Sequence, residues 1–183
     1  MPVSAPKLSV KPVTQSTWPD FETLFEGKGA PKYCWCMAWR PMADRVEADN
    51  VARRQALYER VRKRMPIGLL GYIAGEPVAW CSVAPRETFV KLSDGQDDAE
   101  EGVWSVVCFF IRRDHRKSGL SRHMLDEAVK FAKKRGAKVV EAYPVDPQSP
   151  SYRFMGFVSL FTGRGFKLAG RAGSQRHVMR RAI

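Results

Sequence analysis

The segment 103–143 restricts the fold of this chain more than any other stretch. A nearly continuous apolar run, VWSVVCFFI (103–111), precedes the charged turn RKSGLS (116–121), an amphipathic helical repeat and a second apolar run that begins at Val139. A strand with so few polar residues is typical of the interior of a sheet that is covered on both faces. Two strands joined through a helix run parallel, because the helix returns the chain to its starting edge. The segment therefore predicts a strand–helix–strand unit in the middle of an α/β sheet.

The remaining patterns predict antiparallel strands and further helices around this unit. Residues 8–13 alternate as a short strand, and 67–85 form two apolar strands joined near Gly75, which indicates a β-hairpin. A short helix that ends near Gly163 or Gly165 precedes two last strands. Two other helices are expected, one with Ser16 as its N-cap and Gly27 after its end, and one over 48–65 with these residues inward: Val51, Leu57, Val61 and Met65.

The net charge of +12 over 183 residues favours an anionic partner, which could be nucleic acid, an acidic membrane surface or a phosphorylated cofactor. No apolar run approaches the roughly 20 residues that cross a bilayer. The first residues, MPVSAPKLSVKPV, lack the apolar centre of a secretory signal. We therefore expect a cytoplasmic protein with no membrane partner.

The four cysteines do not form a metal-binding pattern. Cys34 and Cys36 make a C-x-C pair, but neither a second pair nor a histidine follows at the spacing of a zinc site. Cys81 and Cys108 lie in apolar runs, where free cysteine behaves as a small buried side chain. We expect reduced thiols and no metal.

The turn 116–121 has the features of an anion site. The first amides of a helix have no partner within the helix, and the helix dipole adds a partial positive charge there. A glycine such as Gly119 lets the backbone approach a phosphate group closely, and cations stand on both sides. Neither the P-loop pattern nor the dinucleotide pattern G-x-G-x-x-G is present, so the residues alone leave a plain surface turn open as the alternative.

The stretch 106–145 resembles the cofactor-binding core of the GNAT superfamily of acyl-CoA-dependent N-acetyltransferases. That family carries [RQ]-x-x-G-x-[GA] between a strand and a long helix, and this chain has Arg-Lys-Ser-Gly-Leu-Ser at 116–121. The pair Gly165-Phe166 also resembles the G-F pair that ends a later helix in the family. The resemblance implies a single domain over 1–183 with a mixed, mostly antiparallel sheet, a splayed central parallel pair and flanking helices. Its parts would be an N-terminal strand with acceptor-side helices (8–66), a cofactor-binding core (67–143) and a C-terminal helix with strands (144–183).

The resemblance further implies acetyl-CoA as the co-substrate. Backbone amides of the turn would hold its diphosphate, and the end of the preceding strand would pair with the pantetheine arm. Ser121 stands where the family usually has glycine or alanine, and it is still small. The residues implied in cofactor binding are Phe109, Phe110, Ile111, Arg112, Arg116, Lys117, Ser118, Gly119, Leu120 and Ser121.

The catalytic groups follow the family less closely. Phe161 occupies the position at which the family often has a tyrosine that protonates the departing thiolate, so Tyr152 or water would have to supply that proton. An amine attacks only when it is neutral, and a carboxylate can take its proton. Glu141 is the first candidate for this base, with a strand carboxylate paired to an arginine as the equal alternative. His115 and His123 are weaker candidates.

In the resembling fold, the region between the first strand and the hairpin covers the acceptor. The candidate acceptor residues are Tyr33, Trp35, Trp39, Arg40 and Trp80. Aromatic walls with one cation suit a small amphipathic or carboxylated amine. The alternative is that these aromatic side chains only attach an irregular segment to the core.

The sequence thus predicts an enzyme that moves an acetyl group from acetyl-CoA to a primary amine of a small molecule, by direct attack in a ternary complex. A protein lysine or N-terminus is the alternative acceptor. A non-enzymatic nucleic-acid binder is less favoured because the chain has no recognisable nucleic-acid-binding motif. Pairing through edge strands would give a homodimer.

Overall fold

The computed structural model describes residues 7–45 and 47–183, and the first six residues of the expected domain lie outside this part. Seven strands form one sheet in the order β1-β2-β3-β4-β5-β7-β6. Every neighbouring pair is antiparallel except β4 and β5, which confirms the predicted mixed sheet with one central parallel pair. The strands are β1 (Ser9–Pro12), β2 (Gly68–Ile73), β3 (Glu76–Pro85), β4 (Val103–Ile111), β5 (Val139–Ala142), β6 (Lys167–Ala172) and β7 (Arg176–Ala182).

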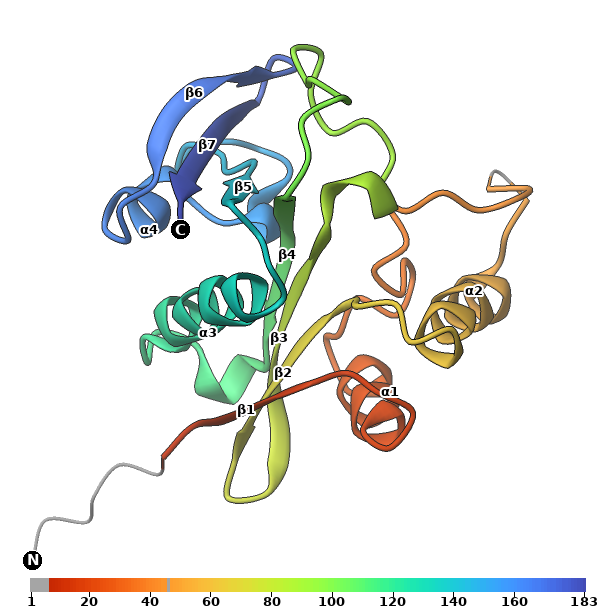
Figure 1. The fold of residues 1–183 in the computed structure, drawn as a ribbon. Coiled ribbons are helices and arrows are strands. Elements are labelled where there is room, and N and C mark those ends of the chain that lie inside the picture. Colours follow the sequence, from red (N-terminus) through yellow and green to blue (C-terminus); the bar gives the residue numbers. More distant parts are fainter. Residues whose placement is uncertain (1–6, 46) are drawn as a thin grey trace, which may run out of the picture.

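Helices cover both faces of this sheet (Figure 1). The helices are α1 (Trp18–Glu26), α2 (Asn50–Arg62), α3 (Leu120–Lys134) and α4 (Val158–Thr162). One buried apolar cluster joins α3 and α4 to one face, and a second joins α1, α2 and the irregular segment before α2 to the other. β4 is buried along most of its length because both clusters pack against it.

Helix α3 forms as its sequence pattern predicts. All six apolar residues expected to face the sheet are buried: Leu120, Met124, Leu125, Ala128, Val129 and Ala132. Gly119 precedes the helix with φ 80°, a left-handed conformation that favours glycine. Lys133 and Lys134 occupy the last turn, where the helix dipole favours cations.

Strands β4 and β5 stay paired only over their first residues. Their ladder runs from Val103 with Val139 to Val106 with Ala142, where β5 ends, while β4 continues to Ile111 alongside β3. On the β3 side, Cys108 is opposite Ser82 and Val106 is opposite Val83, so Val107 is the extra residue of a β-bulge. The sheet therefore opens between β4 and β5 beyond Val106.

Three local predictions were wrong. The N-cap of α1 is Thr17 rather than Ser16, and its hydroxyl accepts a hydrogen bond from the Thr14 amide at 2.9 Å before the helix begins. Val51 is 70% exposed because it lies in the first turn of α2, far around the helix from the buried Leu57. Met65, expected to continue that inward stripe, is only half-buried because α2 ends at Arg62.

Candidate functional site

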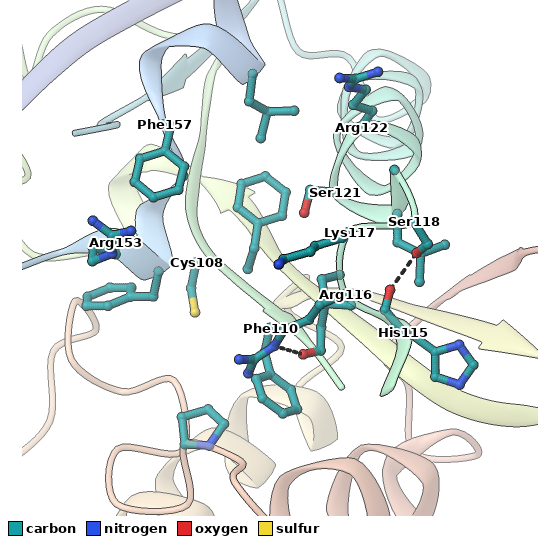
Figure 2. A pocket seen from close by; sticks show the side chains of 18 of the residues that line it. Cys108, Phe110, His115, Arg116, Lys117, Ser118, Ser121, Arg122, Arg153 and Phe157 are labelled. Atoms are coloured by element: carbon teal, nitrogen blue, oxygen red, sulfur yellow. Dashed lines mark hydrogen bonds between the residues drawn. The ribbon is translucent and has the colours of Figure 1, made fainter. Parts of the chain in front are cut away.

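A cavity of about 1450 Å³ lies where β4 separates from β5. Figure 2 shows the side chain of Lys117 directed into it from the turn before α3, with Arg153 and Phe157 on the opposite wall. Segments distant in the sequence form its wall: 29–39, the end of β4, the turn with the first residues of α3, and 153–164. Cys108 contributes its sulfur to the same wall (Figure 2).

The backbone amides of the turn are the strongest feature of this cavity. Within the described part of the chain, the backbone amides of residues 117–121 donate to no protein acceptor. The first helical hydrogen bonds are donated to Gly119 O by the amides of Arg122 and His123. The turn is held by other bonds, with Arg116 Nε donating to Ile111 O at 2.9 Å and Ser118 Oγ donating to His115 O (Figure 2). An ideal Cβ on Gly119 would meet nothing within 4 Å. The turn therefore offers free donors with open space in front of Gly119.

The end of β4 presents a second set of free backbone groups. Arg112 N donates to Val78 O of β3 at 2.8 Å. Because backbone groups alternate along a strand, those of Phe109 and Ile111 face away from β3, towards the side that β5 has left. Ile111 O accepts from Arg116 Nε, so the free groups are the N–H of Ile111 and both backbone groups of Phe109. An extended ligand could pair there as a strand would.

The charge of the cavity wall is one-sided. Five cationic side chains line it, and no Asp or Glu of the described residues does. The cations are Arg116, Lys117, Arg122, Arg153 and Arg164, of which Arg164 also pairs with Asp126 at 3.0 Å. Such a wall favours a ligand with several negative charges.

Arg112, expected at the phosphates, does not line this cavity. Its guanidinium pairs with Asp114 at 2.8 Å and with Glu76 at 3.1 Å. The hydrogen bond from Arg112 holds the pKa of the Asp114 carboxyl below its usual value. The other nine residues expected to bind the cofactor, Phe109–Ile111 and Arg116–Ser121, all line the cavity.

Glu141 is not brought to the cavity. Its carboxylate is 2% exposed and lies 3.2 Å from Arg86 Nη1 and 2.9 Å from Arg180 Nη1. The Tyr143 hydroxyl donates to it at 2.6 Å, and burial is the largest of the causes that raise the pKa of Tyr143. The surroundings of Glu141 correspond to the alternative given above, a strand carboxylate paired with arginine, rather than to a base beside a substrate.

Tyr152 and Phe161 occupy different surroundings. Phe161 is fully buried and packs against Phe109 and Phe166 with ring centroids 6.2 and 5.3 Å away. The Tyr152 ring lies 6.0 Å from that of Trp39, outside the set of residues that line the cavity. Tyr152 therefore contacts Trp39, which lines the cavity, but does not line the cavity itself.

The five expected acceptor residues divide into two groups. Tyr33, which is 68% exposed, and Trp39 line the cavity. The other three, Trp35, Arg40 and Trp80, are buried in the core and do not line it. Trp35 and Trp80 pack around Phe21 and Phe25, and these large aromatic contacts anchor the irregular segment to the core.

Two cysteines that sequence reasoning left aside line the cavity, Cys36 and Cys108. Interaction with the Cys108 thiol, the charge of Arg40 and the Ser82 hydroxyl lower the pKa of Cys36 although burial opposes them. The same interaction, together with burial, raises the pKa of Cys108. Cys34, also on the wall, has its pKa raised to about 11 by burial. Arg40 is four residues from Cys36, but Cys108 comes from β4, and no sequence pattern indicates that the two cysteines meet.

Comparison with known proteins agrees with this geometry. The profile of the acetyltransferase (GNAT) family matches residues 18–157. The chain belongs to that family. A search of curated proteins finds no significant match.

Solved structures show the same fold at low identity. The ribosomal-protein-alanine N-acetyltransferase of Brucella melitensis matches with a TM-score of 0.59 and 17% identity, over 96% of this chain and 99% of that one. YncA of Salmonella typhimurium, solved with its cofactor acetyl-CoA, matches with a TM-score of 0.60 and 14% identity, over 96% of this chain and 93% of YncA. The PaiA N-acetyltransferase of Thermoplasma acidophilum, in complex with coenzyme A, matches with a TM-score of 0.57 and 11% identity, over 97% of this chain and 99% of PaiA.

Two further observations concern only residues 7–45 and 47–183. No helix in this part combines the length and the apolar character that crossing a membrane requires. No group of three or more His, Cys, Asp or Glu side chains in it is arranged to hold a metal ion.

Proposed function

We propose that this protein transfers an acetyl group from acetyl-CoA to a primary amine of a small molecule. The observation that carries the proposal is the row of five free amides at residues 117–121, which opens into a cavity whose charged side chains are all cationic. Amides at a helix N-terminus bind phosphate readily, and acetyl-CoA presents a diphosphate. Acetyl-CoA and CoA are present in the structures of YncA and PaiA, which share this fold.

The end of β4 supports the same assignment. The pantetheine arm carries amide groups, and the backbone groups of Phe109 and the N–H of Ile111 are free on the side where β5 has ended. Binding there would lead the thioester from the turn towards Cys108 and the bulge at Val107. In that position the acetyl group would lie between the cofactor side of the cavity and the aromatic side chains of Tyr33 and Trp39.

The acceptor side favours a small amine with an apolar or anionic part. Tyr33, Trp39 and Phe154 supply apolar surface, and Arg153 supplies a cation. The Arg176 guanidinium lies 4.5 Å from the Trp39 ring centroid and adds positive charge behind the wall. A polycationic amine would meet only like charges here, so we expect polyamines to be poor acceptors.

Direct attack of the amine on the thioester is the simplest course, because one cavity reaches both the turn and the aromatic side chains. The amine must lose a proton for this attack. Glu141 is too enclosed by Arg86 and Arg180 to take it directly, and we propose that Glu141 instead holds β5 and β7 in register.

Release of free thiol from acetyl-CoA, measured across a panel of amines, tests the proposal. We expect amino acids and other carboxylated or aromatic amines to accelerate release, and polyamines and lysine-bearing peptides to do so much less. Preference for peptides would support the protein-acceptor alternative. If short DNA raises the melting temperature at moderate salt while acetyl-CoA leaves it unchanged, the enzyme assignment is wrong.

A further inference from the structure

Arg40 is a buried cation with an unusual set of partners. Its side chain is 1% exposed, and it donates to Ile67 O at 2.8 Å, to Ser82 Oγ at 3.0 Å, to Cys36 O, and to Cys36 Sγ at 3.3 Å. No carboxylate of the described residues lies within ion-pair distance of it. A buried charge without a counter-ion is strongly destabilising. Among its partners, only the Cys36 sulfur can become an anion.

The position of Cys36 connects this ion pair with the cavity. Cys36 is 5% exposed and lines the cavity wall together with Cys108 of β4. In Figure 2 the Cys108 sulfur faces the open part of the cavity, on the same side as the end of the Lys117 side chain. Cys36 interacts with Cys108 and lines the same wall, so it is adjacent to the β4 segment proposed to bind the thioester arm.

The backbone around Cys36 is strained. Trp35 and Cys36 have φ of 45° and 54°, two successive left-handed residues, neither of them glycine. Such conformations persist only where the surroundings enforce them, and they concentrate at functional sites. Here the aromatic contacts of Trp35 with Phe21 and Phe25 hold the segment, and the strained turn directs the Cys36 sulfur towards Arg40.

We propose that Cys36 is a nucleophilic thiolate, held by Arg40 and Cys108, that accepts an acyl group from a thioester bound in this cavity. The inference rests on the proposed function, since it needs an acyl thioester in the cavity. It adds a covalent route beside direct attack.

The chemistry of this route is balanced without any further reactant. The Cys36 sulfur forms a bond to the thioester carbonyl carbon, the bond from that carbon to the carrier sulfur breaks, and the carrier leaves as a thiolate that takes a proton from water. A neutral amine then attacks the S-acetyl carbon, the bond to Cys36 breaks, and the extra proton of the nitrogen passes to the departing sulfur. Thiolate character at neutral pH is what such an attack requires.

Cys34 provides a matched control, because it lines the same cavity two residues away while burial keeps it protonated. The charged or ionisable groups that act on the pair are Arg40, Cys34 and Cys81. Iodoacetamide alkylates thiolates, so its rate reports ionisation. Since the pKa of Cys36 is lowered, we expect its alkylation to persist at mildly acidic pH, whereas Cys34 should react only in alkaline solution.

The experiment is intact-mass and peptide mass spectrometry of the full chain after incubation with acetyl-CoA and no amine. We expect one acetyl group on Cys36 in the unchanged protein and in Cys34→Ser, and none in Cys36→Ser. Protein that binds acetyl-CoA, as seen from a rise in melting temperature, but carries no acetyl group on Cys36 overturns the inference and leaves the proposed function intact.

A second probe distinguishes failure of the proposed function from failure of the Cys36 proposal. S-acetyl-N-acetylcysteamine carries the thioester without a diphosphate, so it does not need the turn. If acetyl-CoA fails to bind but this probe acetylates Cys36, the proposed function is wrong and the thiol site stands. If neither thioester nor iodoacetamide at mildly acidic pH modifies Cys36 ahead of Cys34, the thiol site is wrong.

Discussion

Gly119 combines two properties that set its role in the turn. Its φ of 80° lies in the left-handed region, and the direction in which a side chain would project is open for 4 Å. Gly136 at the other end of α3 has a similar φ of 88° and the same open surroundings, but it lies outside the cavity wall. A substitution at either glycine strains the backbone, but only one at Gly119 also places a side chain in the cavity.

We predict that Gly119→Val lowers the affinity for acetyl-CoA about tenfold or more, because the added side chain fills space in front of the free amides. Gly119→Val and Gly136→Val should each lose about 1–2 kcal/mol of unfolding free energy from the left-handed conformation. Isothermal titration calorimetry and urea unfolding measure the two quantities. Equal acetyl-CoA affinity in both folded variants would contradict the role of the turn.

For Glu141 we predict a role in stability rather than in catalysis. Its buried carboxylate pairs with Arg86 and Arg180, which also share the more exposed Glu100, so Glu141→Gln removes the buried one of their two anions. We expect the free energy of unfolding to fall by about 1–3 kcal/mol, less than for a buried cation left with no anion at all. The affinity for acetyl-CoA should not change, because Glu141 does not line the cavity. A variant of normal stability with a changed pH–rate profile would restore Glu141 as the base.

At the level of elements, α3 is the part that presents the turn. Its six apolar residues bury one face against β2, β3 and β4, while its first turn stays open to the cavity. The sequence predicted this helix well because its apolar spacing follows the helical period without interruption. The prediction for α2 was weaker, because arginines surround only two buried positions, Leu57 and Val61.

Leu125 tests how α3 is held. It is fully buried, and we predict that Leu125→Ala lowers the free energy of unfolding by about 2–5 kcal/mol through lost contacts and the cavity it leaves. Leu168→Ala on β6 is the control, since Leu168 is 66% exposed and should change stability by less than about 0.5 kcal/mol. Urea unfolding compares the two, and an equal loss would show that α3 does not pack as described.

At the level of the whole molecule, the sequence predicted the sheet and the cofactor side better than the acceptor side. The hairpin, the strand–helix–strand unit and the turn follow from local patterns: apolar runs, one charged turn and one glycine. The acceptor side depends on contacts between distant segments, such as Arg40 with Ser82 and Cys36 with Cys108. No periodicity encodes these contacts, which is why Trp35, Arg40 and Trp80 were expected at a pocket that only Tyr33 and Trp39 reach.

The most direct test of the central claim is a titration of isotopically labelled protein with CoA, followed by amide ¹H–¹⁵N NMR spectra. If the diphosphate is held by the turn, the largest shifts appear at the amides of residues 117–121, and Phe109 and Ile111 follow. Amides elsewhere on α3, such as that of Lys134, should move little. Saturable CoA binding that leaves the amides of 117–121 unmoved would contradict the account.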